Sequence, residues 1–462
     1  MPCDAPPSTS ADDERAGIPA LVFPRLSAPR LILLAFAGLI VVGTFLLKIP
    51  GANNGITWLD AFFESVSAVT VTGLQAVVPA EAFTPVGQGI LAALIQLGGL
   101  GIMTAATVGA LLMGRRMGFR ELLIVREELA SPDTPRNVAR LVGQVALITF
   151  LVELVGVVAL TVRFALEGHG IGSLGLAIFH TIAAFCNAGF DIFEGGMASY
   201  AGDPTVNLTL IYLIIAGGLG FPVLVNLYHY PRIRRLTLQS KLVLITTAVL
   251  LVVGVSSVAL LEWTNPLTLG GEPFGTRVLM SLFQGVTPRT AGFATLTYAD
   301  MRDSTLAVQI ALMFIGTAPV STGGGIKVTT LALIFLIFLS QIRGQEEVAA
   351  FDRRIPRSLI AKSLTVLSLS VLLVSGASLA LMISDEVSFL AALFEVTSAF
   401  GTVGLSLGPG YGLATELSPF GKLLLAAVMF AGRVGPITVV VALAQRSKPR
   451  RYTLPEEEIA IG

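Results

Sequence analysis

Four short glycine-containing turns carry the chemistry most specific to this sequence. Each ends in a glycine that is followed by Leu or Phe, and the glycines are 116, 103 and 112 residues apart. The turns are Val71-Thr72-Gly73, Asn187-Ala188-Gly189, Thr290-Ala291-Gly292 and Thr402-Val403-Gly404. Glycine permits a backbone that aims successive carbonyl oxygens to one side, and rings of carbonyls can replace the water shell of a cation. These twelve residues are the predicted ion-binding selectivity filter.

A plainer interpretation is that each glycine only lets two membrane helices pack closely. One Gly-Phe pair would warrant that interpretation. Four matched glycines, each after a short amphipathic segment and before a long apolar one, instead favour strands that line a watery cavity, where irregular backbone is tolerated at membrane depth.

A second glycine-rich stretch, FIGTAPVSTGGGIKVTT at 314–330, interrupts a long apolar segment. Each interior glycine disfavours a helix by ~1 kcal/mol relative to alanine, and Pro319 removes a further backbone hydrogen bond. A phosphate-binding loop would need adjacent Gly and Lys, but Ile326 separates Gly325 from Lys327. Small residues and glycines here suit a movable gate.

Three basic residues lie within apolar surroundings. An intramembrane charge should face a pore or a partner, which makes Arg433 in MFAGRVGPIT (429–438) a functional candidate. Lys327 could instead extend toward the cytoplasm with no role in conduction. Arg289 lies in a filter turn, where its charge would repel a cation, so we expect it to point behind the filter to a carboxylate.

The elements that must position these residues are membrane helices. With 54% hydrophobic residues, 13% charged residues and a mean hydropathy of +0.81, the chain cannot form the water-facing surface of a soluble domain. A net charge of zero gives no reason to expect nucleic acid as a partner. Two distant cysteines and three scattered histidines exclude a metal cluster, and no convergent acid, base and nucleophile indicate an enzyme.

Long and short apolar segments alternate along the chain. Eight are long enough to span ~30 Å of hydrocarbon: 29–48, 86–113, 137–165, 205–229, 238–262, 304–341, 357–383 and 418–445. Four shorter ones end at the filter turns: 58–70, 174–186, 275–287 and 387–400. A second set of aligned glycines, expected to weaken each second membrane helix, is Gly101, Gly220, Gly325 and Gly435.

The order long, short, long occurs four times. It predicts an all-α integral membrane protein of four tandem repeats, each a membrane helix, a pore loop and a second membrane helix, in a pseudo-fourfold arrangement around one pore. The predicted boundaries are a cytoplasmic tail 1–28, repeats 29–113, 137–229, 238–341 (with a gate loop 316–327) and 357–445, and a cytoplasmic tail 446–462.

Basic residues set the expected orientation. Of the 30 Lys and Arg, 22 lie in the tails and in the loops after even-numbered membrane segments, so both termini should be cytoplasmic and all four filter turns should open outward. Several acidic residues, including Glu64, Glu167 and Asp203, then fall on the outer side. They could concentrate cations or simply form a solvated rim.

The motifs VTPRTAGF (286–293), AFCNAGFD (184–191) and SAFGTVGLS (398–406) resemble the filter turns of the Ktr, Trk and plant high-affinity potassium transporter superfamily, and the resemblance covers nearly the whole chain. It implies potassium at the filter, because sodium-selective plant members have serine where this chain has Gly73. It also implies that 314–330 is an intramembrane loop that plugs the pore, held closed by Arg433. The gate residues so implied are Pro319, Ser321, Thr322, Gly323, Gly324, Gly325, Lys327 and Arg433.

Eight membrane helices, with no extra hydrophobic segments before them, resemble Ktr subunits more than Trk subunits. The tail RRYTLPEEEIAIG (450–462) looks like a Ktr carboxyl terminus. The resemblance implies a homodimer in the bacterial inner (plasma) membrane and cytoplasmic nucleotide-binding regulatory subunits of the RCK type. It implies potassium as the transported ion, sodium as an ion that could stimulate uptake, and no organic cofactor.

Two alternatives stay open at this point. A cation-coupled symporter would bind its substrates at broken helices near the midplane, but it usually has inverted repeats, whereas the loop charges here make all four repeats parallel. Within the pore hypothesis, another monovalent cation is the nearest rival to potassium.

Overall fold

The computed structural model describes residues 28–112, 135–168, 170, 172–193, 195–345, 347–408 and 412–443. The predictions for the two terminal tails and for the basic residues of 113–134 lie outside these ranges.

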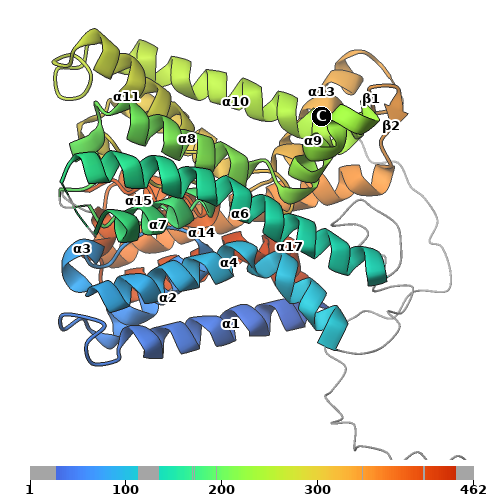
Figure 1. Cartoon of the computed structure of the whole chain (residues 1–462). Helices are drawn as coiled ribbons and strands as arrows, with labels where there is room; N and C mark the ends of the chain where they lie inside the picture. Colours follow the sequence, from blue (N-terminus) through green and yellow to red (C-terminus); the bar gives the residue numbers. More distant parts are fainter. Residues whose placement is uncertain are drawn as a thin grey trace, which may run out of the picture.

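In the first two predicted repeats, long helices alternate with shorter ones (Figure 1). The first repeat has long outer helices and a short inner one, which are α1 (Ala28–Leu47), α2 (Trp58–Thr70), α3 (Pro79–Ala82) and α4 (Pro85–Leu112). The second has α6 (Pro135–Leu166), α7 (Gly172–Phe185), a 3-10 turn η1 (Met197–Tyr200), α8 (Pro204–Gly218) and α9 (Phe221–Ile233).

The last two repeats follow the same order. The third has α10 (Leu238–Glu262), α11 (Phe274–Val286), η2 (Tyr298–Asp300), α12 (Asp303–Phe314) and α13 (Val328–Ile342). The fourth has α14 (Arg357–Asp385), α15 (Phe389–Gly401), η3 (Leu413–Thr415), α16 (Pro419–Val434) and α17 (Pro436–Leu443). The expected all-α fold needs one small correction, because β1 (Ala349–Ala350) and β2 (Arg353–Arg354) form an antiparallel hairpin between α13 and α14.

The four short helices α2, α7, α11 and α15 are here called the pore helices. In two of them, α2 and α15, a capping side chain marks the start and a left-handed residue marks the end. In α2 the Thr57 hydroxyl accepts the Asp60 N–H at 3.1 Å and Asp60 accepts the Thr57 N–H, a capping box. Ser388 caps α15 in the same way, accepting from Ala391 N. Both helices end at a residue in the left-handed conformation, which stops helix propagation and starts the filter turn.

Contacts between the repeats close into a cycle. Each pore helix packs against the first membrane helix of its own repeat, and the second membrane helix packs on the pore helix of the next repeat, in the pairs α4–α7, α8–α11, α12–α15 and α16–α2. The last pair includes an ion pair of 2.9 Å between Lys422 and Asp60. Buried phenylalanines, among them Phe63, Phe185 and Phe394, lie on the pore helices, so the apolar core surrounds the four filter turns.

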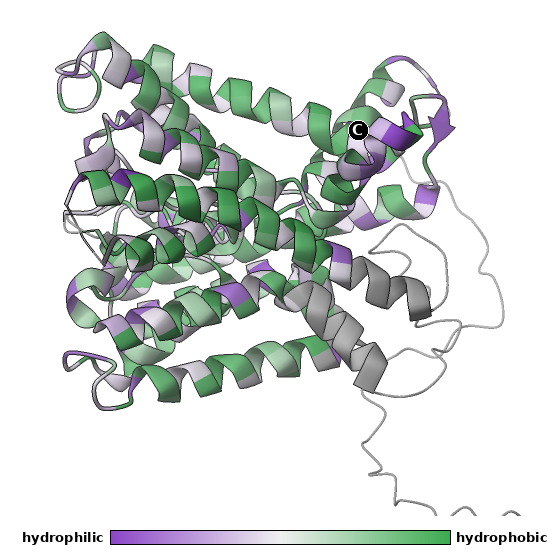
Figure 2. Cartoon of the chain, in the orientation of Figure 1, coloured by the Kyte–Doolittle hydropathy of each residue, from purple (hydrophilic) through white to green (hydrophobic). Residues whose placement is uncertain are grey.

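The outer helices have the composition of membrane spans. In the described part of the chain, residues 143–166 of α6, α10 and α14 are long and apolar enough to cross a membrane, and the bent pair α8–α9 qualifies as a fourth span. The other predicted membrane segments are shorter or broken apolar helices there. Hydrophobic residues cover the length of the helices, and hydrophilic residues gather in the loops at both ends (Figure 2).

The second glycine set breaks three helices and leaves one intact. Gly220 (φ 82°) separates α8 from α9 at a bend of 100°, and Gly435 (φ 91°) separates α16 from α17. Gly325 (φ 69°) lies in the gap between α12 and α13. At Gly101 α4 continues as helix, so the expected weak point there does not end the helix. A glycine without positive φ costs helix stability but does not end a helix.

Candidate ion pathway

The four predicted filter turns share one backbone conformation. Their first residues are left-handed, with φ of 57°, 60°, 68° and 49°, at Val71, Asn187, Thr290 and Thr402. Their glycines also have positive φ, from 65° to 93°, while the residue between has negative φ. Alternating handedness turns consecutive peptide groups toward the same side. The pattern is therefore the one that rings of carbonyl ligands need.

The glycines of the four turns touch in a closed cycle. A methyl group on Gly73 would overlap the Ala188 carbonyl and Gly189, and one on Gly189 would overlap Gly292. A methyl on Gly292 would overlap the Val403 carbonyl, and one on Gly404 would overlap the Thr72 carbonyl and Gly73. These neighbours are backbone atoms, which cannot rotate away as a side chain can. Each turn thus lies directly beside the next, in the order first, second, third, fourth, first.

The carbonyl oxygens of these turns have no hydrogen-bond partner in the described part of the chain. Among the described residues, no hydrogen bond ends on a backbone oxygen of any of the twelve filter residues. Buried carbonyls are almost always paired, so an unpaired set is an exception that needs a ligand such as a cation or water. The C-terminal ends of the pore helices adjoin the turns, and their partial negative charge favours a cation.

The third turn departs from the other three. The pore helix α11 ends at Val286, and Pro288 and Arg289 follow before the left-handed Thr290. Arg289 is buried, and its Nε and Nη1 atoms have no hydrogen-bond partner in the described structure. No ion pair joins it to a carboxylate there, so the partner expected from the sequence is not found.

The predicted gate loop lies against two of the filter turns and against the end of the pore helix that precedes a third. The Gly324 N–H donates to Thr402 Oγ1 at 2.8 Å, and a methyl group on Gly323 would overlap Thr290 Oγ1. Thr322 Oγ1 donates to the Phe185 carbonyl at 3.2 Å, next to the second turn. The loop is therefore in contact with the left-handed ends of the turns.

The start of the loop is fixed to itself and to the α8–α9 bend. Ser321 donates to the Ala318 carbonyl at 2.6 Å and lies 2.7 Å from the Thr317 hydroxyl. The Val320 carbonyl accepts the Phe221 N–H at 3.1 Å, and the carbonyl of Pro319 faces Gly220.

Two cationic side chains donate hydrogen bonds to backbone carbonyls of the loop. Arg433 is 3% exposed; its Nη1 donates to the Thr322 carbonyl and its Nη2 to the Gly98 carbonyl at 2.8 Å. Lys327 is half-buried and donates to the Gly323 carbonyl at 2.6 Å. Its head group therefore turns back onto the loop, unlike the extended side chain of the alternative interpretation.

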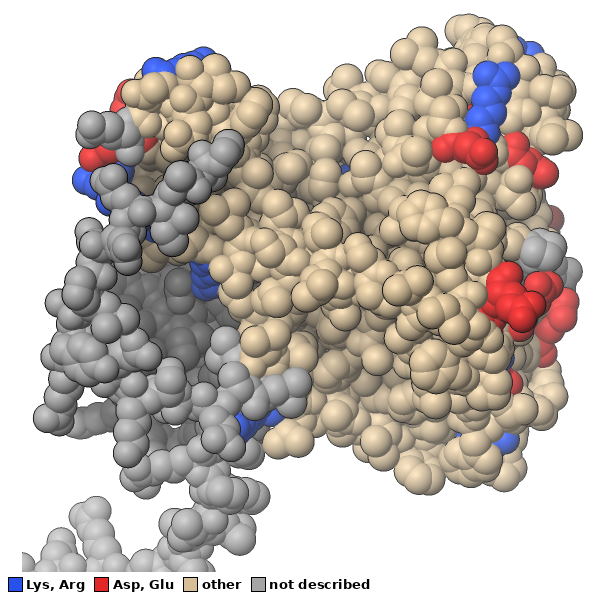
Figure 3. Space-filling model, turned by 180° about the vertical axis from the view of Figure 1, so that it is seen from behind, with Lys and Arg blue, Asp and Glu red and all other residues tan. Residues whose placement is uncertain are grey.

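Several acidic residues of the expected outer rim turn out to have structural partners. Seen from behind, acidic side chains gather at the end where α3 lies in Figure 1, and the face between the ends is almost free of charge (Figure 3). Glu64 is an error of that list, because it is fully buried in α2. It is one of four large buried polar side chains, one on each pore helix, whose role sequence reasoning missed; the available signal was a large polar residue about two helical turns before each filter turn.

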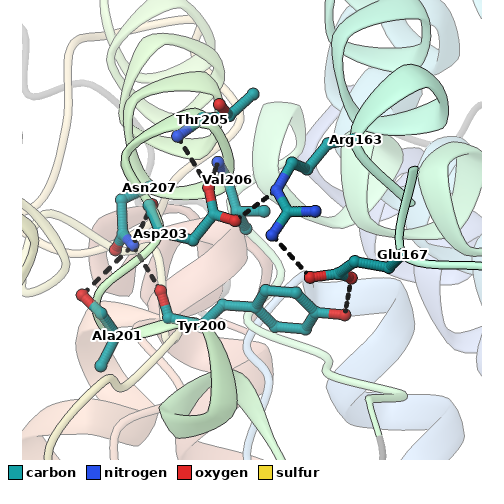
Figure 4. Close-up of polar contacts among 8 residues, drawn as sticks. All are labelled: Arg163, Glu167, Tyr200, Ala201, Asp203, Thr205, Val206 and Asn207. Carbon is teal, nitrogen blue, oxygen red and sulfur yellow. Dashed lines mark hydrogen bonds and ion pairs between the residues drawn. The ribbon is translucent and has the colours of Figure 1, made fainter. Parts of the chain in front are cut away.

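Glu167 and Asp203 also have partners, around a cavity of about 480 Å³ where α6 ends and α8 begins (Figure 4). Arg163 pairs with Asp203 at 2.5 Å and with Glu167 at 2.7 Å. Tyr200 donates to Glu167 at 2.9 Å, and burial together with this hydrogen bond raises the pKa of Tyr200 to about 12. Asp203 also caps α8. These two carboxylates thus fix the loop that follows the second filter turn.

This fold, with its ring of pore helices, is that of a multi-pass membrane transporter. Residues 23–450 match the TrkH family model, described as a cation transport protein. The chain therefore belongs to the TrkH family of cation transport proteins, which confirms the resemblance and the expectation that it is not an enzyme.

Within this family, the chain is similar in sequence to relatives of similar length. The chain is 38% identical over 440 residues to Ktr system potassium uptake protein B of Bacillus subtilis, covering 95% of this chain and 97% of the relative. It is 33% identical to the potassium/sodium uptake protein NtpJ of Enterococcus hirae, covering 95% and 98%. The crystal structure of the potassium transporter TrkH from Vibrio parahaemolyticus shares the fold, with a TM-score of 0.71 at 20% identity over 91% of this chain and 86% of that one.

Proposed function

We propose that this chain is the ion-conducting membrane subunit of a potassium uptake system of the Ktr type. The cycle of four glycine turns with unpaired carbonyls carries the proposal. Four strands side by side can supply the rings of oxygens that a dehydrated potassium ion requires, and side chains at the glycines would block that contact. The four repeats then surround one pore in a pseudo-fourfold arrangement, with the boundaries given above.

The loop at 316–327 serves as the gate of this pore. It contacts two filter turns and the end of the pore helix before a third, and it is tied to Arg433, so it occupies the path that an ion leaving the filter would follow. Two positive charges next to the loop, on Arg433 and Lys327, oppose the passage of a cation while it is closed. Opening requires the loop to leave the filter, which breaks the Thr322–Arg433 contact.

The name of the Bacillus subtilis relative supports an uptake system with more than one component. In this proposal the subunit forms a homodimer in the bacterial plasma membrane, with both termini in the cytoplasm and RCK-type nucleotide-binding regulatory subunits docked there. Sodium has two possible roles, as a stimulating ion or as a second transported ion. The second is the rival function, and the name of the Enterococcus hirae relative favours it.

The test is growth and rubidium uptake at limiting potassium in bacteria that lack their own potassium uptake systems. Expression of the chain with a regulatory subunit should restore both. Gly73→Ser should lower the preference for potassium over sodium, because a side chain at φ 93° is strained and overlaps the Ala188 carbonyl. Gly38→Ser, at a glycine in α1 with open space around it, is the matched control.

Rescue with unchanged relative sodium flux in Gly73→Ser would refute the filter assignment. Equal uptake of sodium and rubidium by the unaltered chain would favour the rival function. Failure of rescue despite verified membrane expression and a matched regulatory partner would point to another cation or to coupled transport.

A further inference from the structure

Each pore helix carries one large, fully buried polar side chain that ion coordination does not explain. These side chains are Glu64 in α2, His180 in α7, Gln284 in α11 and Glu395 in α15. They lie nine residues before the filter glycine in the first, second and fourth repeats, and eight before it in the third. Burial of a polar group is costly unless the group is hydrogen-bonded, so the partners of these four side chains indicate why they are there.

The two glutamates hold the chain that leaves the filter. Glu64 Oε1 accepts the Ala76 N–H at 2.7 Å and the Val77 N–H at 3.3 Å. Glu395 Oε1 accepts the Leu407 N–H at 2.7 Å and also the Ser406 hydroxyl. Ala76 and Leu407 occupy the same position, three residues after the filter glycine.

The histidine reaches the same position with a ring nitrogen. His180 Nδ1 lies 2.9 Å from the Leu176 carbonyl, and in the tautomer with its proton on Nδ1 the Nε2 atom is an acceptor. The Ile192 N–H donates to this nitrogen at 3.4 Å. Asp191, whose carboxylate lies 3.2 Å from Nε2, accepts the next N–H, that of Phe193, at 2.8 Å.

Gln284 completes the set. With its amide oriented so that both of its polar atoms are satisfied, the oxygen accepts the Thr295 N–H at 3.2 Å and the Leu296 N–H at 2.9 Å, and the nitrogen donates to the Tyr298 hydroxyl. Thr295 is again the third residue after the filter glycine. Three side-chain types thus share one property, an acceptor atom aimed at the same backbone N–H in every repeat.

We propose that Glu64, His180, Gln284 and Glu395 are positioning residues of the selectivity filter. This inference rests on the proposed function. In three repeats the entry to the turn is fixed by a backbone bond, from the middle filter residue to the pore helix, of 2.7 to 2.9 Å. The acceptor on the same helix fixes the exit. A strand held at both ends keeps its carbonyls in place although they repel one another and have no bonds of their own.

The residue types at these four positions indicate that the role requires a hydrogen-bond acceptor and not a negative charge. The third repeat has the uncharged Gln284 where the first and fourth have glutamate. In the described residues neither Glu64 nor Glu395 forms an ion pair, and each leaves Oε2 unpartnered. Glutamine should therefore replace glutamate in this role, whereas leucine, of similar bulk but without an acceptor, should not.

The experiment compares potassium and sodium permeation through purified protein in liposomes. We expect Glu64→Leu and Glu395→Leu to lower the potassium-to-sodium ratio about tenfold, equivalent to ~1.4 kcal/mol, and Glu64→Gln to stay within about twofold of the unaltered chain. The matched control is Glu262→Leu. Glu262 is equally buried and accepts four hydrogen bonds, but these hold the loop after α10 and the start of α12 and do not reach the exit of a filter turn.

A folded Glu64→Leu or Glu395→Leu variant with unaltered selectivity would overturn the inference while leaving the proposed function intact. So would a loss in Glu64→Gln equal to that in Glu64→Leu, since charge would then matter. If the leucine variants do not fold, the exchange Glu64→Gln with Gln284→Glu preserves every acceptor and must remain selective. An unaltered chain with no preference for potassium would overturn the proposed function, and this inference with it.

Discussion

Removal of the Arg433 guanidinium should release the gate loop. The side chain is buried, and it joins the loop, through the Thr322 carbonyl, to α4, through the Gly98 carbonyl. Only the first of these bonds restrains the loop. A hydrogen bond to a charged group contributes ~1.5–3 kcal/mol, so Arg433→Ala should shift the closed-to-open equilibrium by roughly 10- to 150-fold.

The assay is the initial rate of rubidium uptake into liposomes that contain the purified protein without a regulatory subunit. Arg433→Ala should raise this rate at least about tenfold if the closed state predominates. Arg433→Lys separates two causes, because it keeps the charge but lacks the two-pronged reach of guanidinium. A fast Lys variant indicates that the hydrogen bonds hold the gate, and a slow one indicates charge repulsion.

The matched control is Arg163→Ala. Arg163 also pairs with two partners, but near the C-terminal end of α6 and away from the loop. Its loss should leave the uptake rate near that of the unaltered chain. A folded Arg433→Ala protein whose uptake rate is equal to or lower than that of the control would refute the role of Arg433 in holding the gate loop closed.

Two further predictions concern stability. Lys422→Met should lower the melting temperature, because it leaves Asp60 unpaired with its side chain only 13% exposed; the change should largely vanish in a Lys422→Met, Asp60→Asn pair, and additive losses would contradict the ion pair. Tyr200 has a pKa of about 12, above the ~10 of a free phenol, so its contribution to stability should be full below pH 10 and lost as the pH rises through 12. Melting curves at pH 8 and pH 11 should show this loss in the unaltered chain and not in Tyr200→Phe, and equal losses in both would contradict it.

The pore helices were predictable because their ends are coded locally. In the first and fourth repeats a capping residue, Thr57 or Ser388, starts the helix and the left-handed residue two before the glycine ends it, so α2 covers the predicted 58–70. The break at Gly220 was predictable for the same reason. The continuous helix through Gly101 was not, since the same residue type is compatible with both outcomes and neighbouring packing decides.

The surroundings of charged residues were the harder part of the site. Glu64 reads as a surface carboxylate because it follows Asp60 by one helical turn, yet its partner lies 12 residues further along the chain, beyond the filter turn. Arg289 likewise gave no indication that it would be buried without a carboxylate nearby. Contacts between residues that are distant in the sequence cannot be predicted from the spacing of neighbouring residues.

The cycle of touching glycines has a consequence for biosynthesis. Gly73 lies against Gly404, which the ribosome adds 331 residues later. The first filter turn therefore has no neighbour on one side until the fourth repeat has entered the bilayer. Until then, the first three turns lie in the membrane without a closed cycle of neighbours. In the proposed function, a truncated product has no complete filter, and ion conduction requires insertion of the fourth repeat.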